Sequence, residues 1–290
     1  MTGAAERSGC GAPLRFGTAG VPRSLSGASH LDGIAEVRRL GLQAMELAFV
    51  HRVNVRPDQA PDVQAQAHRL DVALSAHASY YINLNSPSAD KVKASRYRVL
   101  QAARVGYLCG ADTVVFHAGW RHDDAPERVY QVVRSHVAEM SHILREEGVH
   151  ICLRPETTGK QAQFGDLDEL LRLAQDVPGV RPCLDFAHLH ARQGLMNTED
   201  EFEQVLQRMG QALGSEALQD VHIHVSGIEY GARGEIRHVP LPESDLNYRG
   251  LLGVLARLRV SGRVICESPT NDQDAVLLWH TWLRIRSDQC

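Results

Sequence analysis

The sequence predicts an α/β protein with one domain, a (β/α)₈ TIM barrel. Short runs rich in apolar residues alternate with longer stretches of helical periodicity, and this alternation repeats eight times along 290 residues. Strict alternation indicates a parallel sheet, because parallel neighbours need a helical connection between them. Eight units favour closure into a barrel. An open doubly wound sheet is the alternative, and it is weakened because no G-x-G-x-x-G follows the first strand.

The expected strands are short apolar runs that end at polar residues or turn signals. In order, they are 14–17, 44–47, 72–76, 112–116, 150–153, 180–184, 219–225 and 262–266. The expected helices carry apolar residues three to four positions apart, as Ile34, Val37 and Leu40 do in the first of them. They are 24–40, 62–70, 88–109, 127–147, 166–175, 199–213, 248–258 and 274–285.

The N-terminal segment and the cysteines indicate how the domain is organised and in which compartment the protein is found. Residues 1–12 are small and polar, and we expect a flexible N-terminal tail ahead of a barrel that spans 13–290. The tail lacks the apolar run of a signal peptide, and no stretch approaches the roughly 18 apolar residues that cross a bilayer, so we expect no membrane association. Six scattered cysteines without a C-x-x-C pair favour a reducing, cytoplasmic compartment.

The overall charge is mildly acidic. The formal net charge is −4, and the isoelectric point is about 6.4. The chain as a whole therefore lacks the positive field of a typical nucleic-acid-binding protein, and any such partner needs a local basic patch.

Side chains that can bind metal ions stand where six successive expected strands end. They are His77, His117, Glu156, Asp185 with His188, His222 with His224, and Glu267, and His238 lies in the loop after the seventh strand. The active sites of (β/α)₈ barrels are built on the carboxyl ends of their strands. Imidazole and carboxylate ligands together suit zinc, with manganese as the alternative. We therefore predict a cluster of metal ions on this rim.

Such a cluster suits hydrolysis. A metal ion lowers the pKa of a bound water from about 15.7 to near 7, and paired ions about 3.5–4 Å apart grip both oxygens of a phosphoryl transfer. Glu156 lies between the ligands of the fourth and sixth strands, where a carboxylate can bridge two ions.

Three motifs resemble signatures of the endonuclease IV family of AP endonucleases, which belongs to the xylose-isomerase-like TIM barrel superfamily. Residues 77–84 read HASYYINL, close to the family's H-x-S-Y-L-I-N-L. Residues 183–188 read CLDFAH, close to its C-x-D-x-x-H, and residues 156–159 read ETTG, followed by Phe164 and Gly165. The resemblance runs from residue 16 to residue 269.

The resemblance implies a DNA-repair enzyme, acting in base excision repair, that hydrolyses the phosphodiester 5′ to an abasic site in double-stranded DNA with three zinc ions. It implies that His77, His117 and Glu156 bind the first ion, and that Glu156, Asp185, His222 and Glu267 bind the second. His188 and His238 would bind the third. Glu156 and Glu267 are the expected catalytic carboxylates, and the family resemblance implies a monomer.

The sequence departs from the family pattern after the seventh strand. Where the family has D-x-H, residues 236–238 read IRH, and we expect Glu235 to supply the missing carboxylate. Where the family has H-x-N-D-S, residues 222–226 read HIHVS, and His224 replaces the Asn as a polar or ligand group. The sequence therefore predicts two or three zinc ions.

The resemblance also implies positions that contact DNA. Arg52, Tyr80 and Tyr81 match rim residues that the family inserts into the duplex, and an aromatic side chain can wedge into a base step. Arginines near the expected strand ends can form the local basic patch that phosphate contacts require. They are Arg121, Arg154, Arg192, Arg233 and Arg237.

Two other functions are weighed against the AP endonuclease. A sugar isomerase or epimerase of the same barrel superfamily also uses His, Asp and Glu ligands on the rim, but commonly with a catalytic Lys or His. Lysine is scarce here, and only Lys160 lies near an expected strand end. A barrel that binds damaged DNA without cutting it is the third hypothesis, and it is supported only by the altered loop around residue 236.

Overall fold

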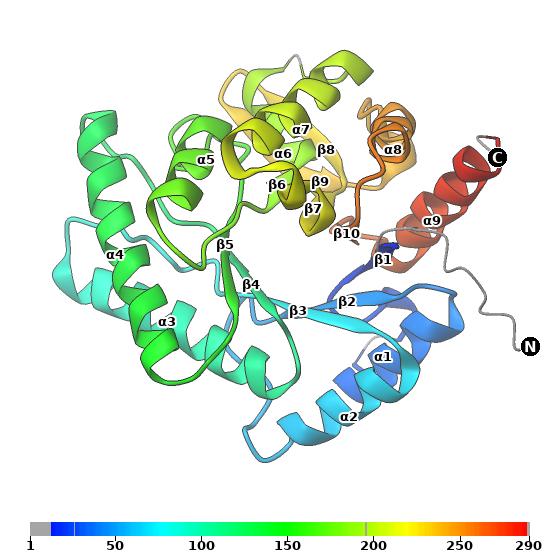
Figure 1. Cartoon of the computed structure of the whole chain (residues 1–290), viewed down its shortest axis with the longest axis horizontal. Coiled ribbons are helices and arrows are strands. Elements are labelled where there is room, and N and C mark those ends of the chain that lie inside the picture. The colour runs from blue at the N-terminus through cyan, green and yellow to red at the C-terminus, as the bar shows by residue number, and fades with distance from the viewer. Residues whose placement is uncertain (1–12, 26, 195, 289–290) are drawn as a thin grey trace, which may run out of the picture.

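The computed structural model describes residues 13–25, 27–194 and 196–288, and in these residues eight parallel strands form one sheet. The strands run in the order β5-β4-β3-β2-β1-β10-β7-β6 and form the centre of the molecule in Figure 1. Their bounds are Leu14–Ala19 (β1), Ala44–Ala48 (β2), Ala73–His77 (β3), Thr113–Phe116 (β4), Cys152–Pro155 (β5), Leu184–Asp185 (β6), Val221–Val225 (β7) and Gly262–Cys266 (β10).

The two ends of the sheet meet. Parallel bridges join Leu153 to Val180 and Glu156 to Cys183, so β5 pairs with the segment that leads into β6. The Cys183 N–H donates to Pro155 O, and the Thr157 N–H donates to Cys183 O, each at 3.0 Å. These contacts close the predicted barrel, which the structure confirms.

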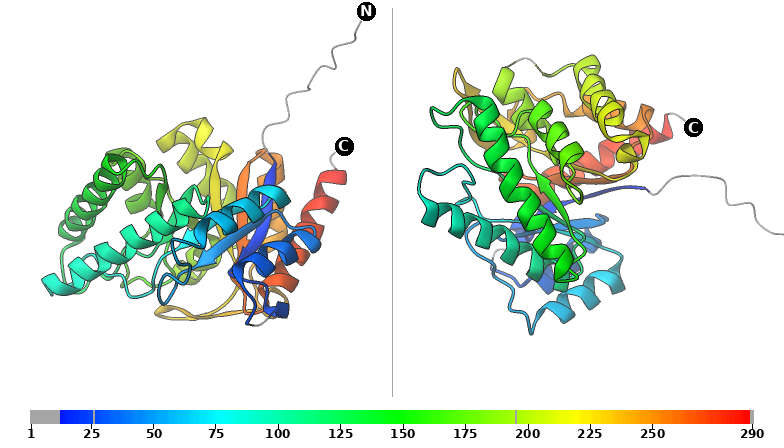
Figure 2. Two further views of the ribbon diagram at one scale, coloured as in Figure 1. Left: turned by 90° about the horizontal axis from the view of Figure 1, so that it is seen from below. Right: turned by 60° about the vertical axis from the view of Figure 1, so that its left-hand side comes forward.

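Helices follow the strands and cover the outside of the barrel (Figure 1). Their bounds are His30–Arg39 (α1), Ala60–Leu70 (α2), Ala89–Leu108 (α3), Pro126–Glu146 (α4), Leu167–Asp176 (α5), Phe186–Gln193 (α6), Glu199–Leu213 (α7), Tyr248–Arg257 (α8) and Asn271–Ser287 (α9). The long helices α3 and α4 lie side by side in both views of Figure 2. The last helix packs on the first strand, where the rings of Trp279 and Trp282 lie 5.6 and 5.7 Å from Phe16.

Two elements start elsewhere than expected because side chains cap them. The helix expected over 24–40 divides into a 3₁₀ turn, Arg23–Leu25, and α1, because Ser29 accepts a hydrogen bond from the Asp32 N–H and so fixes the start of α1. The sixth strand is only two residues long. The Asp185 side chain accepts the His188 N–H at 2.6 Å, which starts the unexpected helix α6 directly after the strand.

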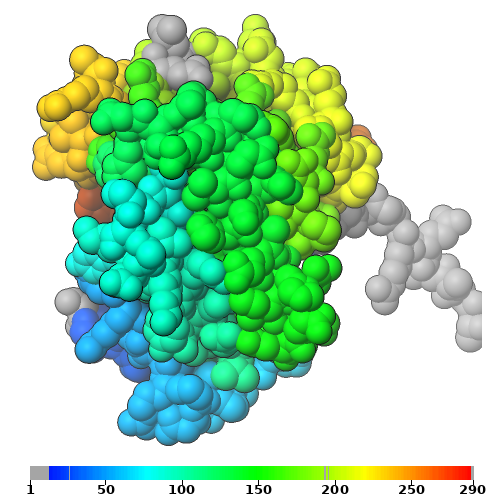
Figure 3. Space-filling model, turned by 90° about the vertical axis from the view of Figure 1, so that its left-hand side faces the viewer, coloured from blue at the N-terminus to red at the C-terminus, as the bar shows by residue number. Residues whose placement is uncertain are grey.

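A hairpin absent from the sequence prediction follows β7. Strands β8 (Gly227–Gly231) and β9 (Gly234–Val239) pair antiparallel, and β9 carries Glu235 and His238. The hairpin lies at the carboxyl end of the barrel, at the left edge in Figure 3 and at the bottom of the left panel in Figure 2. It therefore covers one side of the rim where the predicted metal ligands end their strands.

The tail expected over residues 1–12 lies outside the described residues. No helix in the described part of the chain is both long and apolar enough to cross a membrane.

Close approach of β1 to β2 requires a glycine. A Cβ on Gly17 would lie 1.9 Å from Ala44 O, whereas a Cβ on Gly253 of α8 would meet no atom within 4 Å. We expect Gly17→Ala to lower the free energy of unfolding by about 1–3 kcal/mol, because strand β1 must shift. Gly253→Ala is the matched control and should raise it by about 0.5–1 kcal/mol through helix propensity. Urea unfolding measures both, and equal midpoints for the two variants would contradict this packing.

Candidate metal centre

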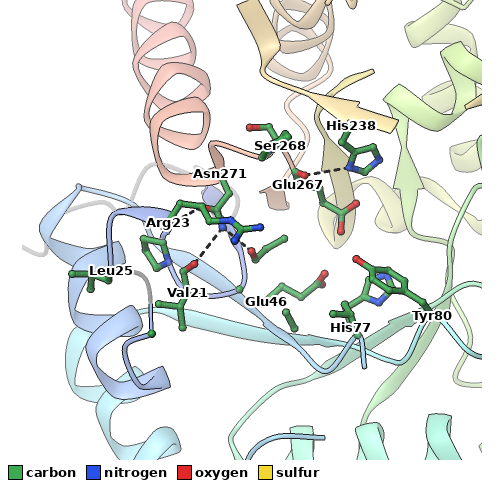
Figure 4. Close-up of a pocket in the computed structure, with 17 residues that line it drawn as sticks. Val21, Arg23, Leu25, Glu46, His77, Tyr80, His238, Glu267, Ser268 and Asn271 are labelled. Atoms are coloured by element: carbon green, nitrogen blue, oxygen red, sulfur yellow. Dashed lines mark hydrogen bonds between the residues drawn. The ribbon is translucent and has the colours of Figure 1, made fainter. Parts of the chain in front are cut away.

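Two adjoining cavities open among the described residues at the carboxyl ends of the strands. Their volumes are about 490 and 300 Å³, and His77, Tyr80, His238 and Glu267 line both. Figure 4 shows the larger one, with Glu46 and His77 on strands along one side and His238 and Glu267 on the other. The remaining predicted ligands surround these walls in three connected groups.

The first group consists of His77, His117 and Glu156. The Nε2 atoms of His77 and His117 lie 3.1 and 2.9 Å from the same Glu156 oxygen, Oε2. The Nδ1–H of His77 donates to Ala78 O at 2.7 Å, which leaves its Nε2 facing the carboxylate. These three predicted ligands therefore converge as one ion would require.

The second group contains Glu156, Asp185, His224 and Glu267. His224 Nδ1 lies 3.3 Å from Glu156 Oε1 and 3.4 Å from Glu267 Oε1. Oδ2 of Asp185 is buried and accepts no hydrogen bond from any described residue. A buried carboxylate oxygen without a donor is costly, and a cation bound by this group would remove that cost.

His222 does not join this group. It lies one pleat deeper on β7 than His224, and its Nε2 approaches Glu46 Oε2 at 2.9 Å. Both residues are buried and face the same side of the strand, since they are two positions apart. In this group the geometry therefore favours His224 over His222, the ligand carried over from the family motif.

The third group consists of Asp185, His188 and His238. The Nδ1–H of His188 donates to Thr157 O at 3.0 Å, and that of His238 donates to Glu267 O at 3.2 Å. Their Nε2 atoms face each other at 3.2 Å. With both Nδ1 atoms protonated, these are two lone pairs at contact distance, an arrangement that a shared cation or proton stabilises.

Glu235, the expected substitute for the carboxylate that the family has in this loop, lies beside the third group. Its Oε2 lies 3.6 Å from His188 Nε2. Its N–H donates to Gly159 O at 3.0 Å, and a Cβ on Gly159 would come within 2.6 Å of the Glu235 Cβ. The small residue at 159 thus lets the hairpin bring a carboxylate to the third group.

Burial and mutual attraction shape the protonation of these side chains. Burial lowers the pKa of His77, but its hydrogen bond to Glu156 and the charges of Glu156, Glu46 and Glu267 together raise it to about 9. Burial raises the pKa of Glu156, yet the neighbouring imidazoles, His117 first, hold it well below its ordinary range. Burial raises the pKa of Asp185 to about 6. A cation competes with the protons on these imidazoles, so the donors accept one more readily as pH rises.

Three aromatic or basic side chains predicted to contact DNA are exposed at the rim. Tyr80 and Tyr81 are 60% and 62% exposed in the segment that follows β3. Arg52 is exposed in the loop after β2. The ring of Tyr80 lies 5.9 Å from that of His77, so the exposed phenol stands beside the first group of ligands.

The predicted basic patch is smaller than expected. Arg121 is bound by Asp166 and Glu169, and Arg192 is buried against backbone carbonyls that include Thr158 O and Gln163 O. Their guanidinium groups are bonded to these carboxylates and carbonyls, which leaves fewer donors for the phosphate contacts predicted from the sequence. Arg154 is buried and bonded to Asp220.

The remaining two arginines of the predicted patch lie on the hairpin. Arg233 is exposed between β8 and β9. Arg237 is exposed on β9 and pairs with Glu229 at 2.6 Å.

Sequence reasoning missed Glu46. This carboxylate lies in the middle of β2, is fully buried, and is contacted by Ser75, His222 and His224. The only signal in the sequence is an acidic residue inside the apolar run AMELA. In a strand buried on both faces, such a residue needs compensating partners, and these come from two other strands.

Comparison with known proteins finds several relatives of this chain by sequence. An uncharacterized protein of Methanocaldococcus jannaschii is 43% identical over 266 residues, which cover 91% of this chain and 95% of that protein. An apurinic-apyrimidinic endonuclease of Caenorhabditis elegans is 26% identical over 162 residues, 54% of this chain and 40% of that protein. An endonuclease 4 homolog of Dictyostelium discoideum is 23% identical over 161 residues, 54% of this chain and 29% of that protein.

Solved structures share the fold. Endonuclease IV from Thermus thermophilus aligns with a TM-score of 0.72 at 22% identity, covering 94% of this chain and 99% of that one. A D-tagatose 3-epimerase-like protein aligns with a TM-score of 0.73 at 18% identity, covering 96% and 100%. The endonuclease relatives confirm the resemblance drawn from the motifs, while the fold is common to nucleases and epimerases.

A family description also matches most of the chain. The xylose isomerase-like TIM barrel family matches residues 34–284, from the first helix to the last. This chain belongs to the xylose isomerase-like TIM barrel family.

Proposed function

We propose that this protein is a metal-dependent endonuclease that hydrolyses the phosphodiester 5′ to an abasic site in double-stranded DNA. One observation carries the proposal: Glu156 belongs to the first and second groups of ligands, and Asp185 belongs to the second and third. Shared carboxylates of this kind could hold up to three cations side by side. Adjacent ions suit phosphoryl transfer, in which the attacking and leaving oxygens both need charge stabilisation.

The residues present fit zinc. Each group combines imidazole with carboxylate, and the histidines that donate Nδ1–H to backbone carbonyls leave Nε2 free to bind. Zinc supplies an activated water at neutral pH and neutralises charge on a phosphate. Manganese is the alternative that the carboxylates of the second group allow.

The side chains of this protein would have separate roles in orienting water, holding the ligand groups together and binding DNA. Glu267 lies at the cavity wall, with its side chain 14% exposed, where it can orient the attacking water and accept its proton. Glu156 is buried and holds the first two ligand groups together. Tyr80, Tyr81 and Arg52 stand at the mouth, where a duplex would lie, and aromatic rings can stack on bases exposed at a lesion.

A sugar epimerase is the second candidate because one ligand group is complete without the others. Glu156, Asp185, His224 and Glu267 could hold one ion with three carboxylates and one imidazole. Structural neighbours include a D-tagatose 3-epimerase-like protein and a D-psicose 3-epimerase of Clostridium cellulolyticum. In that function His77 and His117 would be dispensable as ligands. Their convergence on Glu156 therefore favours the nuclease.

Metal content tests the arrangement of ligands. We expect the purified protein to bind two or three zinc ions, and His117→Ala to bind one fewer because the first group loses a ligand. The exposed His142, on the outer helix α4, supplies the control His142→Ala, which should keep the full complement. Elemental analysis after removal of loosely bound metal measures the ratio. A single ion in the wild type, unchanged in His117→Ala, would favour the one-ion epimerase.

Incision tests the function. A duplex oligonucleotide with one abasic-site analogue should be cut once, 5′ to the lesion, and Glu267→Gln should lower the rate by about 100-fold or more, because general-base assistance contributes on that order. Glu146→Gln, at an exposed site on α4, is the control. A shifted but uncut duplex would identify a non-catalytic binder of damaged DNA. Absence of both cutting and binding, with turnover of a ketohexose, would instead establish the epimerase.

Rim contacts can be tested separately from chemistry. Tyr81→Ala should weaken binding of the abasic duplex by about 1–3 kcal/mol if its ring stacks at the lesion, without changing the zinc content. Tyr97→Ala removes an equally exposed tyrosine, 59% exposed on α3, and should leave the affinity unchanged. Fluorescence anisotropy measures both, and equal losses in the two variants would refute a specific role for Tyr81.

A further inference from the structure

The fully buried carboxylate of Glu46 stands directly behind one predicted metal ligand. Its Oε1 lies 3.2 Å from His224 Nε2, on the opposite side of the imidazole from Glu156 and Glu267. Glu46, His224 and Ser75 are all fully buried. A carboxylate so far from water needs donors, and its surroundings supply them.

Two donors from neighbouring strands reach one oxygen of this carboxylate, and a third nitrogen faces the other oxygen. The Ser75 hydroxyl donates to Oε2 at 2.9 Å, and His222 Nε2 lies 2.9 Å from the same oxygen. His224 supplies the third contact, to Oε1. Strand β2 thus contributes the acceptor, and β3 and β7 contribute the donors.

The contact between Glu46 and His224 can be compared with the contacts of the histidines in the other two groups. Three of the four, His77, His188 and His238, donate Nδ1–H to a backbone carbonyl and turn Nε2 toward other ligands, although Nδ1 of His188 also lies 3.1 Å from Glu156 Oε1. His224 is oriented the other way round, with Nδ1 toward Glu156 and Glu267. Nε2 of His224 makes no hydrogen bond to any described residue, and the buried Glu46 Oε1, which also lacks a hydrogen-bond partner, lies 3.2 Å from it.

We propose that Glu46 is a positioning residue for the second group of ligands: it accepts the Nε2–H of His224 and so keeps the Nδ1 lone pair directed at the ion. A carboxylate partner fixes the tautomer and ring orientation of a ligating histidine and increases its basicity. Ser75 and His222 hold the carboxylate in place. This inference rests on metal binding by the second group and is independent of which substrate the protein acts on.

The arrangement also explains why His222 is present without being a ligand. Its Nε2 lies 2.9 Å from Glu46 Oε2, so a neutral ring protonated there donates a hydrogen bond to the carboxylate. A charged side chain at this depth would add a second buried charge, whereas a neutral imidazole supplies only a hydrogen bond. The pair of histidines on β7 thus has two tasks, one as a ligand and one as a support for the ligand's partner.

Zinc affinity measured by competition with a chromophoric chelator tests this role without any DNA. Glu46→Gln replaces one acceptor oxygen by an amide donor, and we expect the affinity of one ion to fall about 10- to 100-fold while the ions of the other groups keep theirs. Glu46→Asp keeps the charge and should recover part of the loss. Glu36→Gln, on the outer helix α1 and paired with Arg39, is the control and should match the wild type.

A spectroscopic measurement on the wild type covers the case in which Glu46→Gln fails to fold. Long-range ¹H–¹⁵N correlation of the histidine rings in the zinc-loaded protein should show His224 protonated on Nε2 and bound through Nδ1. The reverse tautomer would overturn the proposal, as would an unchanged zinc affinity in a folded Glu46→Gln variant.

A competing arrangement makes a different prediction. Cys183, His222 and His224 are close enough to hold an ion themselves, with Glu46 beside them. If Glu46→Gln and Cys183→Ser each abolish the same ion outright, Glu46 is a ligand and the positioning role is wrong. If zinc affinity responds to Glu46→Gln as expected but abasic DNA is never cut, the positioning role stands and the proposed nuclease function fails.

Discussion

The carboxylate of Glu156 is the point on which the rest of the rim depends. Four imidazoles from different elements surround it: His77 and His117 at Oε2, and His188 and His224 at Oε1. Both oxygens are fully buried. A buried charge of this kind is stable only while its partners stay in place, so the ends of β3, β4 and β7 and the start of α6 are all constrained by one side chain on the loop after β5.

The barrel makes this convergence possible. Parallel strands end on the same side, and a closed ring of eight directs their last side chains toward a common axis. Closure at the β5–β6 junction is therefore more than a topological detail, because the bridge between Glu156 and Cys183 holds Glu156 and Asp185 at adjacent places on the ring. These are the two carboxylates that link the three ligand groups.

Much of the fold, and the convergence of several predicted ligands, could be predicted because both follow from periodicity and strand ends. His77, His117, Glu156 and Asp185 each follow a recognisable apolar run, and their convergence follows from the barrel alone. The choice between His222 and His224 could not be made this way. Both lie on the same face of β7, and only the depth of the facing residue, Glu46 or Glu156, separates them. The intramolecular partners of Arg121 and Arg192 could not be predicted either, because they lie 29–48 positions away in the chain, where sequence pattern gives no information.

The least predictable part of the rim is also the part least determined by the barrel. The third group takes Asp185 and His188 from the junction of β6 and α6, but His238 and Glu235 come from the hairpin β8–β9, which the ring of strands does not position. The hairpin is held instead by local contacts, such as the Glu235 N–H bonded to Gly159 O, and by the His238 Nδ1–H bonded to Glu267 O. A family pattern can change most easily in such a segment. The carboxylate expected two positions before His238 is here an isoleucine, and Glu235, one position earlier, reaches His188 because Gly159 leaves room for it.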